Sequence, residues 1–158
     1  MAIEIVAVTP ENVEQAIACA QKVFKPNDHF SIRQEFMAAA GMEPERSAVR
    51  SSVEIHRAAY VMALKDGMPA GFSGYYSHVG HEEDVWLGWT GVGEDFCRLG
   101  IGEKVVAQAL NAAKFEGVEN FRIWTTNESE YDSARKLYAR MGFAEEAYNA
   151  DALPTEGA

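Results

Sequence analysis

The segment whose residue types most suggest chemistry is a glycine-bearing stretch between a predicted strand and a predicted helix. It reads Val92-Gly93-Glu94-Asp95-Phe96-Cys97-Arg98-Leu99-Gly100-Ile101-Gly102. Glycines let a backbone turn tightly, so that several N–H groups can face one point. The following helix adds the positive end of its dipole, and such a place binds phosphate with few cations. Arg98 can bind phosphate oxygens through paired donors. The segment predicts a phosphate or pyrophosphate site, although a turn that only joins strand to helix would use the same glycines.

Two nucleotide-binding patterns are excluded by the same residues. A P-loop requires Gly, four residues and then Gly-Lys followed by Ser or Thr, and the sequence has no such stretch. A dinucleotide fingerprint that began at Gly91 would require a third glycine where the chain has Phe96. The glycine turn therefore matches neither pattern.

The rest of the sequence predicts the elements that would position this turn. Apolar runs and alternations predict strands at residues 3–8, 58–65, 68–77, 85–92, 121–126 and 143–147. Apolar residues at helical spacing predict helices at about 10–25, 31–40, 102–115 and 129–141, with a weaker one near Pro44. Ser31 and Gln34 form a capping box for the second helix, and Asp66-Gly67 is typical of a hairpin. This order of elements predicts an α+β fold with a mixed sheet.

The composition is that of a globular chain with an acidic balance. Its 158 residues, 47% of them hydrophobic, predict one domain at 1–150 and a small polar tail at 151–158. A formal charge of −10 argues against nucleic acid or an anionic membrane as a partner. The sequence shows neither a membrane-spanning run nor a signal-peptide pattern. Its two cysteines, Cys19 and Cys97, suit a reducing compartment, so we expect a cytoplasmic protein.

A second motif lies on the last predicted helix, one helix and one strand after the glycine turn. It reads Ala134-Arg135-Lys136-Leu137-Tyr138-Ala139-Arg140-Met141-Gly142-Phe143. Together the two motifs resemble the GNAT superfamily of acetyl-CoA-dependent N-acetyltransferases. The likeness extends from the first strand through Phe143 and is most specific in Leu99-Gly100-Ile101-Gly102 and in Leu137-Tyr138 followed by Gly142-Phe143. It implies a mixed, mostly antiparallel sheet of six to seven strands with flanking helices and a splayed cofactor cleft.

The resemblance also implies how acetyl-CoA, the co-substrate, would be held. Val92 would offer its backbone to the pantetheine arm. The pyrophosphate would rest on the backbone amides of Cys97, Arg98, Leu99, Gly100, Ile101 and Gly102. The family usually has Gln or Arg where this chain has Cys97. It often has Asn where this chain has Tyr131, and Asn127, four residues earlier, is the amide that would replace it.

For catalysis, the resemblance assigns Tyr138 as the proton donor to the leaving thiolate. The alternative is that Tyr138 only packs in the core, on the apolar stripe of its helix. A strand-end N–H such as that of Val92 would stabilise the oxyanion. The acceptor must also lose a proton, because a lysine-like amine is mostly protonated at pH 7. The acidic run Glu82-Glu83-Asp84 offers Glu83 as the base, although such a run is more typical of a solvated strand entrance.

Three further features are weaker signals. His78 and His81 form a His-x-x-His pair without a third ligand at metal-site spacing, and the resemblance implies no metal. Cys97 has no histidine close in sequence to activate it as a nucleophile, which favours direct attack of the amine in a ternary complex. Trp86 and Trp89, three apart in one predicted strand, should point to opposite faces.

The sequence thus predicts an N-acetyltransferase that moves an acetyl group to a primary amine of a small molecule or peptide. The acceptor side, roughly residues 24–54, carries charges of both signs and does not identify the amine. A non-catalytic acyl-CoA-binding or sensing domain is the alternative, and a subunit that only scaffolds a partner is a third. Similar proteins commonly form homodimers, but these residues argue neither for nor against one.

Overall fold

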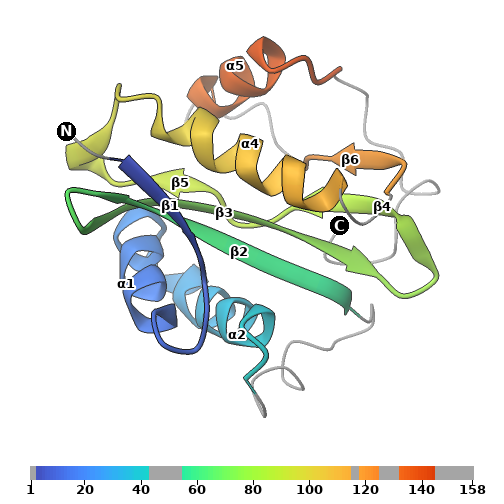
Figure 1. Cartoon of the computed structure of the whole chain (residues 1–158), viewed down its shortest axis with the longest axis horizontal. Coiled ribbons are helices and arrows are strands. Elements are labelled where there is room, and N and C mark those ends of the chain that lie inside the picture. The colour runs from blue at the N-terminus through green and yellow to red at the C-terminus, as the bar shows by residue number, and fades with distance from the viewer. Residues whose placement is uncertain (1–2, 43–54, 115–117, 125–131, 145–158) are drawn as a thin grey trace.

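The computed structural model describes residues 3–42, 55–114, 118–124 and 132–144. A sheet forms the middle layer and helices lie on both of its faces (Figure 1). On one face are α1 (Val13–Val23) and α2 (His29–Ala39), and on the other are α4 (Ile101–Lys114) and α5 (Asp132–Arg140). Short 3-10 turns, η1 (Pro26–Asp28) and η2 (Glu94–Phe96), come before α2 and α4.

The sheet is mixed and mostly antiparallel. Its six strands are β1 (Ile3–Ala7), β2 (Ile55–Lys65), β3 (Met68–His78), β4 (His81–Leu87), β5 (Gly91–Val92) and β6 (Asn120–Arg122). Their order is β1-β2-β3-β4-β6, and β5 pairs with β3. All pairs are antiparallel except β4 with β6, which is parallel. The predicted α+β fold with a mixed, mostly antiparallel sheet is confirmed.

Local turn chemistry explains where several elements begin and end. The β2–β3 turn is the predicted hairpin at Asp66 and Gly67, whose φ angles of 52° and 83° suit a two-residue turn. Helix α2 ends before Gly41, which has a φ of 82°. The capping box predicted at Ser31 is wrong, because η1 leads straight into α2 and the helix already begins at His29.

The strand predicted at 85–92 is interrupted by a bend at 88–90 that separates β4 from β5. Trp86 faces the side of α1 and α2, since its neighbour Val85 packs on the α4 side and strand side chains alternate. Trp89 packs on the same side as Trp86, with its ring centroid 4.9 Å from that of Phe24. The prediction that the two tryptophans point to opposite faces is therefore wrong, because the bend breaks the alternation.

Apolar side chains fill both faces of the sheet. Between the sheet and α1–α2 lie the fully buried Ile17, Ile32, Phe36, Met62 and Phe72. At the start of α4, Ile101 and Val105 of the helix pack with Ala63 of β2 and Ala70 of β3. Gly71 of β3 allows this close approach, because a Cβ there would lie only 2.8 Å from Cγ2 of Ile101. The first turn of α4 is thus held directly against β3.

Several predicted elements differ from the structure or lie beyond it. Strand β6 ends at Arg122 and is shorter than predicted. Phe143 and Ala144 are not in a strand. The weak helix near Pro44, the later part of the last predicted strand and the tail at 151–158 lie outside the described residues.

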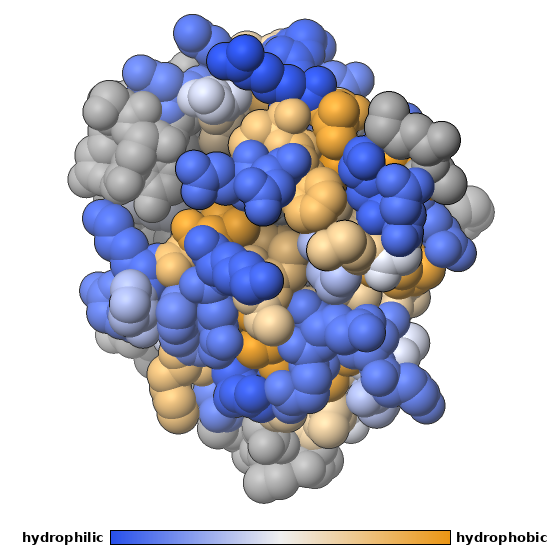
Figure 2. Space-filling view, turned by 90° about the vertical axis from the view of Figure 1, so that its left-hand side faces the viewer, coloured by the Kyte–Doolittle hydropathy of each residue, from blue (hydrophilic) through white to orange (hydrophobic). Residues whose placement is uncertain are grey.

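The surface of the described residues carries scattered apolar side chains. The large exposed ones are Phe30, Met68, Val79 and Trp124, at four separate places in the chain. Figure 2 likewise shows apolar patches divided by hydrophilic residues on the side that it views. None of the helices in the described ranges has the length and apolar character needed to cross a membrane.

Candidate active site

The strands part at one point in the sheet. β4 pairs with β6 from Asp84 to Trp86, opposite Asn120 to Arg122. Asp84 joins the two strands through an ion pair with Arg122 Nε (3.4 Å) and a hydrogen bond from Asn120 Nδ2 (2.8 Å). Beyond Trp86, the only strand that pairs with 87–92 within the described residues is β3. In the described part of the chain no strand covers the edge of 87–92 that faces away from β3, and we refer to this edge as the open edge. Its backbone groups can meet a ligand.

The strand register identifies which backbone groups face that open edge. The N–H of Gly93 donates to the carbonyl oxygen of Ala70 at 2.8 Å, and Val92 is opposite Gly71. Hydrogen-bonded and non-hydrogen-bonded pairs alternate along an antiparallel ladder. Val92 therefore points its N–H and C=O away from β3 and toward the open edge.

The glycine turn follows directly and ends in α4. η2 leads from Gly93 to the exposed Cys97 and Arg98. Arg98 and Gly100 have φ angles of 66° and 76°, left-handed conformations that fold the backbone back on itself. The first turn of α4 closes with Lys104 N–H donating to the Gly100 carbonyl oxygen at 3.2 Å. An α-helix leaves its first N–H groups without an intrahelical acceptor, so this end of α4 can bind an anion.

Helix α5 brings Tyr138 to the same end of α4. A Cβ on Gly102 would lie 3.5 Å from Cδ2 of Leu137, and Arg140 Nε lies 3.3 Å from Glu103 Oε1. Tyr138 is partly buried, and burial raises the pKa of its phenol above the ordinary value of 10.0. The phenol therefore holds its proton at neutral pH.

The end of α5 has the geometry that its sequence predicts. Gly142 has a φ of 97°, and its N–H donates to the Ala139 carbonyl oxygen at 3.1 Å. Phe143 N–H donates to the Tyr138 carbonyl oxygen at 3.0 Å, which is the glycine-ended helix stop known as a Schellman motif. The Phe143 ring then meets the Tyr138 ring edge-on, at a centroid distance of 6.3 Å. This stop fixes the last turn of α5, and with it Tyr138.

The structure thus brings together Val92, the turn at 97–102 and the helix that carries Tyr138. It does not bring Glu83 to them. Glu83 is exposed, nine residues before Val92, and lies beside the segment of β4 that pairs with β6. Two further predicted cofactor contacts lie outside the described residues, Asn127 and Tyr131.

The described residues contain no group of three His, Cys, Asp or Glu side chains placed to hold a metal ion. His78, one member of the weak His-x-x-His pair, is 2% exposed, and its ring centroid lies 5.4 Å from that of Tyr76. It packs against an aromatic ring within the sheet.

The sequence profile described as the acetyltransferase (GNAT) family matches residues 27–143, which include the glycine turn and the α5 motif. The chain belongs to the GNAT family. The predicted membership is therefore confirmed, although no curated protein matches the sequence significantly.

Solved GNAT structures share this fold at low sequence identity. A protein described as a GNAT acetyltransferase from Desulfovibrio desulfuricans superposes with a TM-score of 0.72 at 19% identity, over 92% of this chain and 87% of that one. The aminoglycoside N-acetyltransferase AAC(6')-Iy, solved with a CoA bisubstrate analogue, gives 0.69 at 14% identity, over 94% and 95%. Ribosomal-protein-alanine N-acetyltransferase from Brucella melitensis gives 0.63 at 15% identity, over 94% and 96%.

Tyr60, which the sequence did not single out, secures the bend beside the open edge of this GNAT sheet. Its ring passes over Gly74, where a Cβ would lie 2.4 Å from the ring. Its hydroxyl accepts the backbone N–H of Trp89 at 2.9 Å. Burial, and then the nearby Glu35 carboxylate, raises the pKa of the phenol well above 10.0. The hydroxyl is therefore neutral and serves the bend as a hydrogen-bond acceptor.

Glu35 of α2 is the second residue that sequence reasoning missed. Its Oε2 accepts the indole N–H of Trp89 at 2.8 Å. Glu35 stands three residues after Ile32 and four before Ala39, two residues of the predicted inner face of α2. Residues three and four apart are neighbours on a helix surface. An acidic residue next to the apolar inner face was therefore a signal that could have identified Glu35.

Replacing Tyr60 by phenylalanine should lower the free energy of unfolding by about 1–2 kcal/mol, because it leaves a partly buried backbone N–H without its acceptor. Urea denaturation of the variant and the parent measures the difference. Phenylalanine keeps the ring stack on Phe36, whose centroid lies 4.2 Å away, so the hydroxyl alone is tested. A variant as stable as the parent would show that the hydrogen bond contributes nothing to the bend.

Proposed function

We propose that the protein is an acetyl-CoA-dependent N-acetyltransferase that acetylates a primary amine of a small molecule or peptide. The observation that carries the proposal is the conjunction of an open strand edge at 87–92 with a glycine turn at the start of α4. Acetyl-CoA has an amide-containing pantetheine arm and a diphosphate. The open edge would pair with the amides of the arm, and the glycine turn would bind the diphosphate.

The residues of the turn fit such a ligand. The backbone folds back at Arg98 and Gly100, and the unpaired N–H groups at the start of α4 follow at once. Cys97, Arg98 and Gly100 are exposed, so a ligand can reach them. Cys97 in place of the family's usual Gln or Arg removes one side-chain contact but not the backbone amides. We therefore assign the pyrophosphate to the backbone of 97–102 and the pantetheine arm to the carbonyl oxygen of Val92, which leaves the Val92 N–H for the thioester oxyanion.

The reaction then needs a stabilised oxyanion and a proton for the departing sulfur. The N–H of Val92 points toward the open edge and would stabilise the oxyanion of the attacked thioester. Tyr138 lies on the helix beside the turn and holds its proton at neutral pH, so it would supply the sulfur's proton. Acetyl-CoA supplies the activated acetyl group, and the amine attacks it directly.

Two measurements test the proposal. Calorimetry should detect CoA and acetyl-CoA binding, and thiol release from acetyl-CoA should occur with at least one amine of a panel of primary amines. Binding without release for every amine would favour the alternative, a non-catalytic acyl-CoA-binding domain. No binding at millimolar ligand would overturn both functions.

Replacing Gly100 by alanine should weaken CoA binding about tenfold. Alanine is strained at a φ of 76°, so the turn would relax away from the shape that faces the diphosphate. Gly142→Ala is a matched control, because Gly142 also has a positive φ of 97° and a Cβ on either glycine would have no other atom within 4 Å. Both variants should lose similar stability in thermal denaturation, but calorimetry should show weaker CoA binding for Gly100→Ala alone. Equal CoA affinities of the two variants would contradict the assignment of the diphosphate to this turn.

A further inference from the structure

The carboxyl of Glu35 contacts the bend at 88–90. It comes from α2 and is bonded to the Trp89 indole at 2.8 Å. Glu35 is partly exposed, yet burial raises its pKa above 4.5, an effect that the indole hydrogen bond partly offsets. The carboxyl is therefore largely desolvated, on a residue that keeps part of its surface exposed.

The Trp89 indole contacts this carboxylate, and two tyrosine phenols lie near enough to respond to its charge. Its charge contributes to the raised pKa of the Tyr60 phenol and to that of Tyr76, which reaches about 12. Trp89 donates to it, and the Phe24 ring packs edge-on against Trp89 at 4.9 Å. Both phenols stay neutral at physiological pH, so Glu35 is the negative charge within this aromatic group. A carboxylate with aromatic rings is the environment that binds an organic ammonium.

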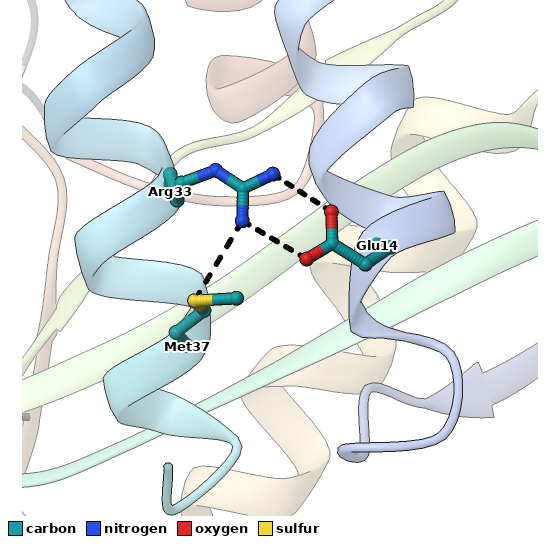
Figure 3. Close-up of polar contacts among 3 residues, drawn as sticks. All are labelled: Glu14, Arg33 and Met37. Carbon is teal, nitrogen blue, oxygen red and sulfur yellow. Dashed lines mark hydrogen bonds and ion pairs between the residues drawn. The ribbon is translucent and has the colours of Figure 1, made fainter. Parts of the chain in front are cut away.

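The neighbouring charged pair lies on the helix surfaces. Arg33, two residues before Glu35, donates to Glu14 of α1 through both terminal nitrogens, at 2.9 and 2.7 Å (Figure 3). One of these nitrogens also lies 3.8 Å from the sulfur of Met37. The pair lies on the exposed surface of the two helices, where solvent screens an ion pair and its contribution is small, so the position of Glu35 does not depend on it.

The position of Glu35 relative to the open edge suggests its use. Trp89 follows the last β4–β6 pair, at Trp86, by three residues and lies in the bend that begins the open segment. Glu35 touches this bend from the face of α1 and α2, whereas the glycine turn and Tyr138 belong to the face of α4 and α5 (Figure 1). An acceptor that comes from the α2 side would therefore meet Glu35 before it meets the cofactor.

We propose that Glu35 binds the ammonium group of the acceptor and takes its proton, so that the acceptor is a cationic alkylamine. The inference rests on the proposed N-acetyltransferase function and assigns its missing base. The hydrogen bond from Trp89 and the packing of α2 hold the carboxylate in place. Glu83, exposed near the start of β4, is the rival for this role.

Protons and electron pairs balance in this transfer. One N–H bond of R–NH3+ breaks, and the proton passes to Glu35. The freed lone pair forms the C–N bond at the thioester carbon, and the C–S bond breaks with its electron pair on sulfur. Tyr138 gives its proton to that sulfur. It then recovers a proton from the nitrogen, and the last of the three ammonium hydrogens stays on the nitrogen of the amide product. Glu35 finally releases its proton to water.

The test compares Glu35→Gln with the parent. Thiol release from acetyl-CoA is measured with benzylamine, a diaminoalkane and lysine methyl ester, which are cationic, and with aniline, which is neutral. Glutamine keeps an oxygen that accepts the Trp89 N–H, so the variant removes the charge without removing the hydrogen bond. Glu14→Gln is the matched control, because it removes a carboxylate from the same helical layer.

Glu35→Gln should lower kcat/KM for the best alkylamine roughly tenfold to 100-fold at pH 7, with unchanged CoA affinity and a smaller preference for alkylamines over aniline. Since Glu35 must be ionised, the parent's kcat/KM should fall as pH drops through a pKa above 4.5, and the variant should lack this limb. Glu14→Gln should keep it.

A second readout does not depend on turnover. Titration of Glu35 should change the tryptophan emission of the parent in the same acid range, and Glu35→Gln and Trp89→Phe should both lack that transition. The inference would be overturned if Glu35→Gln had the kinetics and pH profile of the parent. It would also be overturned if Glu83→Gln, and not Glu35→Gln, lost the acid limb of kcat/KM. Either result would leave the proposed acetyltransferase function intact. No turnover of any amine by the parent would overturn the proposed function and the inference together.

Discussion

Replacing Tyr138 by phenylalanine should lower kcat about 100-fold to 10,000-fold, the usual contribution of a positioned proton donor. The phenol lies on the helix that contacts the start of α4, and burial raises its pKa above 10.0. It is therefore fully protonated between pH 6 and roughly 9, and its ionisation should add no limb to the parent's activity profile in that range. Initial rates of thiol release with a saturating amine measure the effect.

The substitution is suited to this test because phenylalanine preserves the packing. The Tyr138 ring contacts Phe143 at 6.3 Å, and phenylalanine can keep that contact. CoA affinity by calorimetry and the midpoint of thermal unfolding should therefore stay close to those of the parent. If the rate is unchanged, Tyr138 is a packing residue of α5, and the thiolate leaves unaided or takes its proton from water. If the rate and CoA affinity fall together, the residue positions the cofactor instead.

The parts of the fold that could be predicted are those that local chemistry decides. The hairpin at Asp66-Gly67 needs only residues that tolerate positive φ. Helix α4 and its glycine turn are likewise encoded within about 20 consecutive residues, by apolar spacing that begins where the glycines end. The end of α5 follows from Gly142 alone. In each case the deciding residues are neighbours in sequence.

The parts that could not be predicted depend on contacts between distant segments. Residues 85–92 are a continuous strand by pattern, and the bend within them is held by Tyr60, 29 residues away from Trp89 in sequence. Glu35 is 54 residues from Trp89, and its sequence neighbours carry charges of both signs. The start of α2 was also missed, because η1 continues into the helix without a side-chain cap. Hence the glycine turn and the start of α4 could be predicted from sequence, whereas the contact between Glu35 and Trp89 became visible only in three dimensions.

Replacing Gly74 by alanine should lower the free energy of unfolding by about 3 kcal/mol, the upper end of the usual cost of overpacking. A Cβ at this position would lie 2.4 Å from the carbonyl oxygen of Ala59 and 2.4 Å from the Tyr60 ring. The ring has little room to withdraw, because Phe36 stacks on it at a centroid distance of 4.2 Å. At this chain length the loss should lower Tm by about 6–12 °C.

Gly102→Ala is the control for the Gly74 prediction, since it adds the same methyl group where there is room. Its nearest atom would be Cδ2 of Leu137 at 3.5 Å, and alanine favours a helix by up to about 1 kcal/mol over glycine. Gly102→Ala should therefore keep or raise Tm, while Gly74→Ala lowers it. Gly74→Ala should also move the Tyr60 hydroxyl away from Trp89, so the bend and the adjacent open edge would lose their support, and acetyl transfer would fall even below the new Tm. A Gly74→Ala protein with parental Tm and activity would mean that Tyr60 can repack, and that its ring does not fix the bend.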